Sequence, residues 1–273
     1  MKKRGILLAL VLALTLTLTA CWPGEIAVDT KLNTDGSGTR SYSVVVYDDS
    51  LQTDPIINPD DPDQTEGKGA VINSIHITGG VSEIQTWLEE NAPTWMTVED
   101  MQTEGNQRIF TMTYDFTDFD DFLAKYEELV DLSPNLSWSD FDANELPTFE
   151  CEGFLTKECT FFESTNIVNA SIDWAKDGIW TDIYDEASLA GYVTKDDIAV
   201  LADYTLDLNG ETIEEIHEYD ADAVDGDGTG AVVNVTSESF TLATSFTNTT
   251  SIIILVVIVA AIGGGVVFFV RKK

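Results

Sequence analysis

The chain has 273 residues, of which 48 are acidic and 14 are basic, so its formal net charge is −34 at pH 7. Six basic residues lie at the two chain ends, which leaves a formal charge of −40 on the segment between them. A surface this acidic repels phosphate backbones, so nucleic acid is excluded as a partner. Because 44% of the residues are hydrophobic, we still expect a folded core.

The first 20 residues have the features of a lipoprotein signal peptide. A basic start precedes an apolar run interleaved with threonine, and Leu18-Thr19-Ala20-Cys21 matches the lipobox that precedes an acylated cysteine. The alternative is an ordinary secretory signal with a chance cysteine after the cleavage site. We expect residues 1–20 to be removed and Cys21 to carry the lipid, which places the protein at the cell membrane on its extracytoplasmic face.

Residues 21–246 are expected to form one extracytoplasmic α+β domain. Alternating apolar residues predict a β-hairpin at its start, from strands at 25–32 and 39–47. Strands at 71–78, 95–101 and 107–116 and helices at 82–91 and 118–130 follow. The first helix carries Ser82 and Gln85 at the spacing of a capping box.

The second half of the domain is predicted from weaker patterns. An extended stretch at 148–163 and a third helix at 166–177 precede a set of strands at 202–208, 212–219, 231–235 and 240–246, which complete a sheet. Asn209-Gly210 is a strong turn signal after the first of these. The expected fold class is therefore α+β, with one or more antiparallel sheets packed with two or three helices.

The last 22 residues predict a second membrane anchor. Residues 252–270 are apolar and uncharged, and as a helix of about 1.5 Å per residue they match a hydrocarbon core about 30 Å thick. We expect one C-terminal transmembrane helix there, reached through a tether at 247–251 and followed by a basic cytoplasmic tail at 271–273. Small residues, among them Gly264 and Gly265, make a homodimer through this helix a possible arrangement.

Two cysteines remain in the domain once Cys21 is assigned to the lipid. Cys151 and Cys159 are eight positions apart, and a disulfide closing this short loop suits an external protein. Two reduced thiols are the alternative. A metal site is the weakest of the three interpretations, because His76 and His217 are isolated in the sequence.

The densest acidic loop is a weak candidate for calcium. It contains Asp220, Asp222, Asp225 and Asp227 and imitates the start of an EF-hand loop, but the register places Thr236 where a glutamate is needed. A glycine-rich hairpin turn is the simpler interpretation. The sequence has no nucleophile, metalloprotease or phosphate-loop motif, so we expect neither an enzyme nor a bound cofactor.

Several of these features together resemble the LppM-like bacterial membrane lipoproteins. They are the lipobox cysteine, the early hairpin with its Asp-Gly-Ser-Gly turn, the central α+β region and the late Leu-Asn-Gly-Glu turn, and the best matching stretches are 21–51 and 204–246. The resemblance implies an α+β domain enclosing an apolar cavity, and a role in binding envelope lipids or glycolipids. It implies no catalytic residues.

The leading functional hypothesis is therefore a non-enzymatic cell-envelope lipoprotein, anchored at both ends, that binds a lipid or glycolipid at the outer membrane surface. One alternative is an adhesion or assembly module whose acidic surface binds a protein partner. Another is a surface protein that binds calcium weakly. An apolar cavity between sheet and helices would favour the first hypothesis, and a solid core with an exposed apolar patch would favour the adhesion or assembly module.

Overall fold

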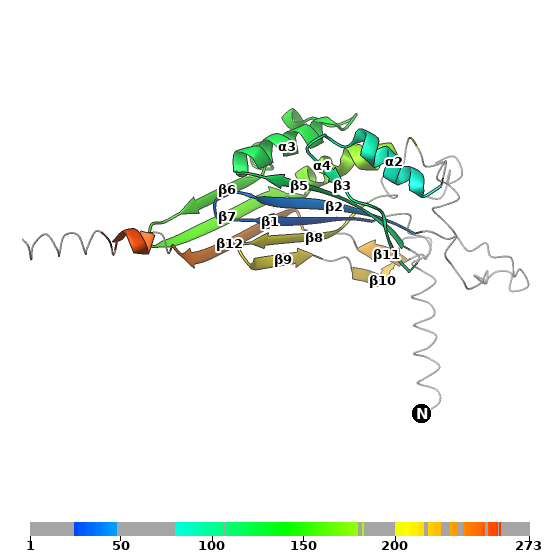
Figure 1. The fold of residues 1–273 in the computed structure, drawn as a ribbon. Coiled ribbons are helices and arrows are strands. Elements are labelled where there is room, and N and C mark those ends of the chain that lie inside the picture. Colours follow the sequence, from blue (N-terminus) through cyan, green and yellow to red (C-terminus); the bar gives the residue numbers. More distant parts are fainter. Residues whose placement is uncertain are drawn as a thin grey trace, which may run out of the picture.

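The computed structural model describes residues 25–47, 80–105, 107–179, 182, 200–215, 218–224, 230–233, 237–248, 251–255 and 257. Within these ranges the protein is α+β: helices cover one face of a large sheet, and a second sheet extends from one end of it (Figure 1). The expected signal peptide, Cys21 and the strand expected at 71–78 lie outside the described residues.

The large sheet is built around the predicted N-terminal hairpin. Its order is β3-β5-β2-β1-β8-β9, with β4 also paired to β5. The strands are β1 Glu25–Leu32, β2 Gly38–Tyr47, β3 Thr97–Val98, β4 Gln102–Glu104, β5 Gln107–Phe116, β8 Val200–Leu208 and β9 Glu211–Glu215. The predicted Asn-Gly turn joins β8 to β9, with positive φ at both Asn209 (54°) and Gly210 (91°), as a tight hairpin of this hand requires.

The expectation of purely antiparallel sheets is wrong. Strand β1 pairs with β2 in antiparallel register but with β8 in parallel register, so that Val28 faces Tyr204 and Leu32 faces Leu208. A parallel pair needs a long crossover connection, and the chain between β1 and β8 supplies one because it holds the helices and the second sheet. The large sheet is therefore mixed, with the first strand of the domain in its interior.

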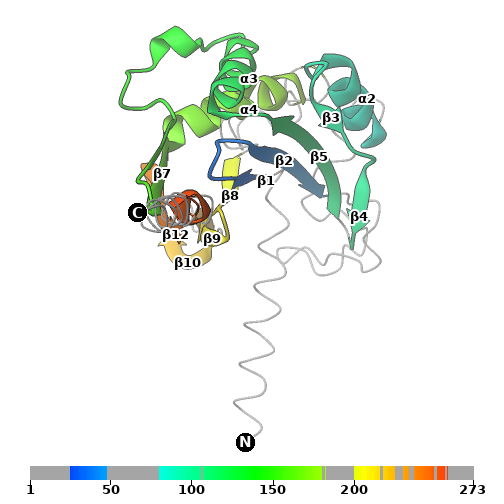
Figure 2. The same cartoon turned by 60° about the vertical axis from the view of Figure 1, so that its left-hand side comes forward.

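Three α-helices form the layer above this sheet, and all three were predicted (Figure 2). They are α2 Ser82–Asn91, α3 Phe119–Asp131 and α4 Thr165–Gly178, and a short 3₁₀ turn, η4, spans Trp138–Asp140. Asp118 caps α3 and Ser164 caps α4 by accepting a hydrogen bond from a backbone N–H in the first turn. The capping box expected at Ser82 and Gln85 is wrong, because α2 has no side-chain cap and Gln85 donates to Glu89 and to the carbonyl of Glu99.

The second sheet has the order β12-β7-β6 and is called the arm below. Its strands are β6 Thr148–Glu152, β7 Thr156–Ser164 and β12 Ser239–Thr247, all antiparallel. The last strand was expected to complete the same sheet as 202–208, but it pairs with β7 instead. The strand expected at 212–219 forms its first part as β9, while β10 Glu218–Val224 begins a separate two-stranded unit with β11 Gly230–Val233, the strand expected at 231–235.

The C-terminal transmembrane helix is a further expectation that has to be corrected. In the described part of the chain no helix is long and apolar enough to cross a membrane. A span needs about 20 apolar residues, whereas the described helical positions at this end are 251–255 and 257. The other positions of the expected range 252–270, like the tail 271–273, lie outside the described residues.

Helix α2 joins the rest of the helical layer through one close aromatic contact. The ring of Trp87 stacks on that of Trp174 in α4, with the centroids 5.9 Å apart. It also lies over Gly178, the last residue of α4, where an added Cβ would come within 1.8 Å of Trp87 Cζ2. A real Cβ cannot be accommodated at that distance, so α2 can dock here only because position 178 has no side chain.

We predict that Gly178→Ala lowers the free energy of unfolding by about 1–3 kcal/mol, the usual cost of forcing extra volume into a packed site. Urea unfolding followed by circular dichroism measures the loss. In a Trp87→Ala background the same substitution should cost much less, because the clashing ring is gone. An equal cost in both backgrounds would show that the Trp87 contact is not the cause.

Candidate functional site

A buried ion pair lies at the centre of the domain, between the large sheet, the helices and the arm. Along β2 the inward-facing positions are Arg40, Tyr42, Val44 and Val46, so the arginine occupies an otherwise apolar row. Along β7 the corresponding row is Cys159, Phe161 and Glu163. The strand alternation therefore points both charges into the core, where each side chain is 0% exposed.

The carboxylate of Glu163 is saturated by donors from three elements. Arg40 Nη1 lies 3.1 Å from both carboxylate oxygens, the Tyr126 hydroxyl of α3 donates to one at 2.9 Å, and the Tyr204 hydroxyl of β8 donates to the other at 2.5 Å. Arg40 Nη2 also donates to the Tyr126 hydroxyl at 3.3 Å. We call these four residues the Arg40–Glu163 cluster. Buried charges are tolerated when they are paired and hydrogen-bonded in this way.

Aromatic rings enclose the guanidinium. Its carbon lies 4.8 Å from the ring centroid of Tyr126, 5.4 Å from that of Tyr42 and 5.7 Å from that of Phe122. Each ring face attracts the cation, and the attraction is stronger where water is excluded. The hydroxyl of Tyr42 in turn donates to Ser171 at 3.1 Å, which extends the polar contacts to α4.

The electrostatics of the cluster favour the ionised pair and neutral phenols. Burial by itself lowers the pKa of Arg40, but the attractions of Glu163 and of the neighbouring tyrosines together outweigh this effect, and the pKa is raised well above its ordinary value. Burial raises the pKa of Tyr126 and Tyr204 well above their usual range, and the proximity of the Glu163 charge adds to it. The tyrosines therefore remain hydrogen-bond donors to the carboxylate at every physiological pH.

The cluster has the properties of a structural centre, because its members are shielded from solvent and their polar groups form hydrogen bonds to one another. Within the cluster Arg40 Nε has no hydrogen-bond partner among the described residues, and outside it the same holds for Thr30 Oγ1, Gln85 Oε1 and the Tyr114 hydroxyl. The space between the sheet and the helices is filled at this point by charged and aromatic side chains. The resemblance implied an apolar cavity, whereas the described residues at this point form a polar and aromatic cluster.

Sequence reasoning missed both charges, although a signal was present. Arg40 shares its strand parity with Tyr42 and Val44, and Glu163 shares its parity with Phe161. One inward charge of each sign on two apolar strand faces indicates a buried pair. Their separation of 123 positions hid the pairing.

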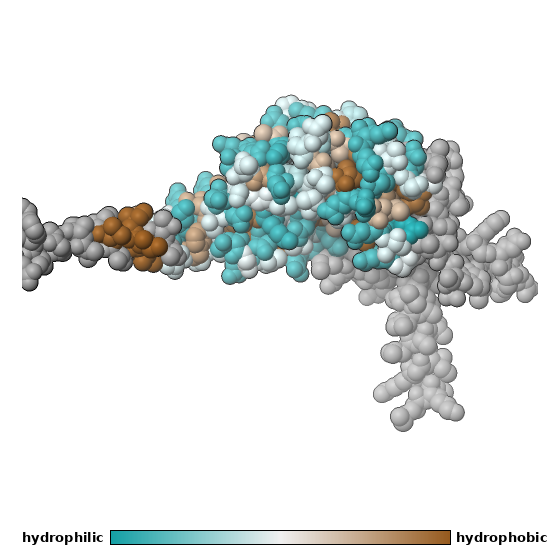
Figure 3. Space-filling model, viewed as in Figure 1, coloured by the Kyte–Doolittle hydropathy of each residue, from teal (hydrophilic) through white to brown (hydrophobic). Residues whose placement is uncertain are grey.

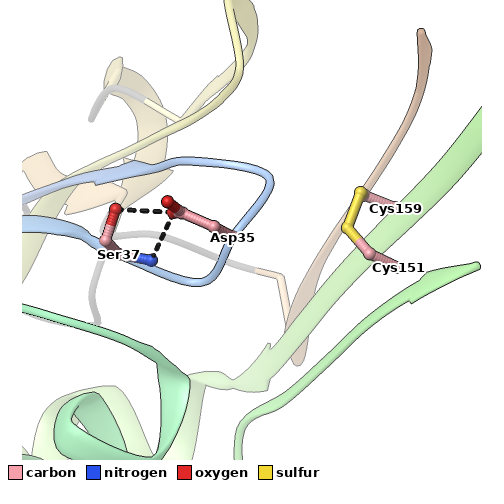
Figure 4. The surroundings of a disulfide bond; sticks show 4 residues. All are labelled: Asp35, Ser37, Cys151 and Cys159. Atoms are coloured by element: carbon pink, nitrogen blue, oxygen red, sulfur yellow. Dashed lines mark hydrogen bonds between the residues drawn. A yellow bond between two sulfur atoms is a disulfide. The ribbon is translucent and has the colours of Figure 1, made fainter. Parts of the chain in front are cut away.

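The structure brings the two candidate cysteines together. Cys151 and Cys159 face each other across β6 and β7 with their Cα atoms 4.1 Å apart, and their sulfur atoms are bonded (Figure 4). Figure 4 also shows the β1–β2 turn, where the Asp35 carboxylate accepts hydrogen bonds from the hydroxyl and backbone N–H of Ser37. These bonds lower the pKa of Asp35.

The calcium candidate receives no support from the described residues. Asp220 and Asp222 lie on β10, while Asp225 and Asp227 lie outside the described part of the chain. Among the residues that the structure describes, no group of three or more histidine, cysteine, aspartate or glutamate side chains could hold a metal ion.

The exposed apolar side chains gather at the free end of the arm. The β6–β7 turn places Phe154 and Leu155 in solvent, 58% and 44% exposed. The Asn248 N–H donates to the carbonyl of Leu155 at 2.8 Å, which holds the following helical residues beside this turn. With the turn they form the apolar end of the molecule (Figure 3), whose members are Phe154, Leu155, Ile252, Ile253, Ile254, Leu255 and Val257.

Backbone geometry keeps this turn tight. Gly153 has φ of 110°, and a Cβ there would lie 2.0 Å from the carbonyl oxygen of Thr156. Only glycine fits, so the chain reverses within three residues and projects the next two side chains outward. Of the large hydrophobic side chains described as exposed, Leu132 at the end of α3 is the single one outside the apolar end.

No family model, no curated protein and no solved structure matches this chain. The resemblance to LppM-like lipoproteins therefore stays a prediction.

We predict that Glu163→Gln lowers the free energy of unfolding by about 3–5 kcal/mol, because it leaves the buried charge of Arg40 uncompensated. Urea unfolding at neutral pH measures the loss. Lys125→Met is the matched control: it removes a partly exposed pair with Asp121 at 3.0 Å and should cost under about 1 kcal/mol. Similar losses in the two variants would contradict the importance of the buried pair.

We predict that stability falls steeply above about pH 10. Burial raises the pKa of Tyr42, Tyr114, Tyr126 and Tyr204, so the unfolded chain loses these protons first, near its ordinary value of about 10. Below about pH 10 the neutral phenols contribute their full stability. This contribution is lost as the pH rises through the higher pKa values that the phenols have in the folded protein. Each phenol should add about 1.4 kcal/mol per pH unit to the slope.

Urea midpoints measured between pH 8 and pH 11.5 test this dependence. Tyr114→Phe removes one buried phenol whose hydroxyl lacks a described partner, so stability at pH 8 should change little while the alkaline slope becomes shallower. An unchanged slope would rule out titration of buried phenols as its cause.

Proposed function

We propose that this chain is a non-enzymatic lipoprotein of the cell envelope, acylated at Cys21, which binds a lipid or glycolipid at the outer surface of the membrane. The observation that carries the proposal is the apolar end of the arm. It gathers all but one of the large hydrophobic side chains that are exposed among the described residues, and Figure 3 shows the helical part of this end as a hydrophobic patch. A gathered apolar patch on a polar protein marks an interaction site.

The energetics of such a contact favour lipid. Fully burying one large apolar side chain contributes roughly 1.5–3 kcal/mol, so Phe154 and Leu155 together supply a useful membrane affinity to a chain that is already held nearby. The amino acids that follow support the same partner, because from Ile252 to Val270 the sequence contains no charged residue. An acyl region accepts such side chains without any matching surface.

The form of the apolar end argues against a protein as the first partner. A standard protein–protein interface takes about 800 Å² from each side and needs a broad complementary surface. The β6–β7 turn presents two exposed large side chains, Phe154 and Leu155, beside the described helical positions 251–255 and 257. A turn with two exposed apolar side chains can enter a fluid lipid phase without a complementary partner surface.

Two further features support the envelope location. The N-terminal sequence has a signal peptide ending in a lipobox, and the disulfide between Cys151 and Cys159 suits an oxidising compartment outside the cytoplasm. The LppM-like resemblance points to the same class of ligand, although the filled interior moves the expected lipid contact from a cavity to the apolar end.

Site-specific photo-crosslinking in the full chain tests the proposal. A photoreactive leucine analogue replaces Leu155, or Leu132 as the matched control, since the two leucines are 44% and 43% exposed but lie on different layers. After irradiation in the producing cells, we expect lipid adducts on the peptide containing position 155 and none on that containing position 132. Crosslinks from position 155 to a protein would favour the adhesion or assembly hypothesis, and equal labelling of both positions would also overturn the proposal.

A further inference from the structure

The apolar end is bordered by carboxylates. Glu152 and Glu158 face each other directly across β6 and β7, immediately beside the disulfide pair, and both are exposed. Glu150 follows two positions further along the same strand face. Like charges in directly opposed positions destabilise a strand pair, and the adjacent disulfide holds the two strands in this register.

Basic side chains are almost absent from the arm. Among the residues of β6, β7 and β12, Lys157 is the only basic one. It has the opposite strand parity to Glu158 and therefore projects from the other face, where its charge acts on Asp35. Among the residues of the three arm strands, no cation therefore lies beside these carboxylates on their own face.

This pattern is the reverse of the usual membrane-surface contact. Proteins that bind anionic lipids place lysine or arginine beside their apolar residues, each worth about 1 kcal/mol near a charged surface. Here an apolar tip that enters the lipid would bring two opposed carboxylates to the level of the headgroups. An anionic headgroup would meet like charge, whereas a neutral or zwitterionic headgroup would not.

We propose that the apolar end selects lipids without net negative charge, with Glu152 and Glu158 excluding anionic headgroups from its surroundings. This inference rests on the proposed lipid contact and adds the class of lipid to it. The carboxylates act by repulsion, so the selectivity should weaken as salt screens the charges.

The test uses the full chain reconstituted into vesicles of phosphatidylcholine and phosphatidylglycerol in equal amounts at low ionic strength, with the photoreactive leucine analogue at position 155. Mass spectrometry of the adducts gives the ratio of the two lipids next to the apolar end. We expect phosphatidylglycerol to be depleted about fivefold, the factor that corresponds to about 1 kcal/mol. In 0.5 M salt the adduct ratio should approach the bulk ratio.

Paired charge removal identifies the residues responsible. The double variant Glu152→Gln and Glu158→Gln should return the adduct ratio to that of the bulk lipid. Glu90→Gln with Glu127→Gln removes the same charge from exposed positions of the helical layer and should leave the depletion unchanged. Equal effects of the two double variants would assign the selectivity to overall charge and overturn the inference.

The outcomes separate this inference from the function on which it depends. Lipid adducts in the bulk ratio at low salt would overturn the headgroup selectivity and leave the lipid contact in place. Absence of any lipid adduct at position 155 would overturn both.

Discussion

Arg40 and Glu163 meet in the middle of the domain, and the arrangement of every layer depends on their contact. The arginine comes from the large sheet and the glutamate from the arm, while Tyr126 brings in the helical layer and Tyr204 the parallel strand β8. An apolar contact would tolerate sliding of these elements. A fully buried charge pair does not, because a shift that breaks it leaves two uncompensated charges away from water. The pair thus sets how the arm is joined to the sheet.

A rigidly joined arm gives the apolar end a defined place. Phe154 and Leu155 lie in the turn between β6 and β7, and β7 carries Cys159 near its middle and Glu163 next to its last residue. The buried cluster and the exposed turn therefore lie at opposite ends of the same strand. The cluster fixes the position of the strand, and the exposed turn carries the proposed lipid contact.

Local patterns predicted the elements but not how they assemble. The boundaries of α2 follow from its apolar stripe and from the glycine and proline that flank it, and the Asn209-Gly210 turn follows from residues that tolerate positive φ. The parallel pairing of β1 with β8 has no local signal, since strand partners are chosen by the packing of distant segments. The Arg40–Glu163 pair was missed for the same reason, and the exposure of Phe154 and Leu155 was missed because a Phe-Leu dipeptide resembles any short core segment.

The interior position of β1 has a consequence for how the chain reaches its native state. During synthesis β1 and β2 are made before their partners. Glu25 of β1 pairs with Val200, and Arg40 pairs with Glu163, which lies 123 positions later in the chain. The early hairpin therefore cannot complete a core of its own, and contacts between such distant segments slow folding. Until β8 arrives, an apolar strand with an unpaired edge stays open to other chains. The hairpin of β1 and β2 therefore stays without its parallel partner strand until most of the domain has been made.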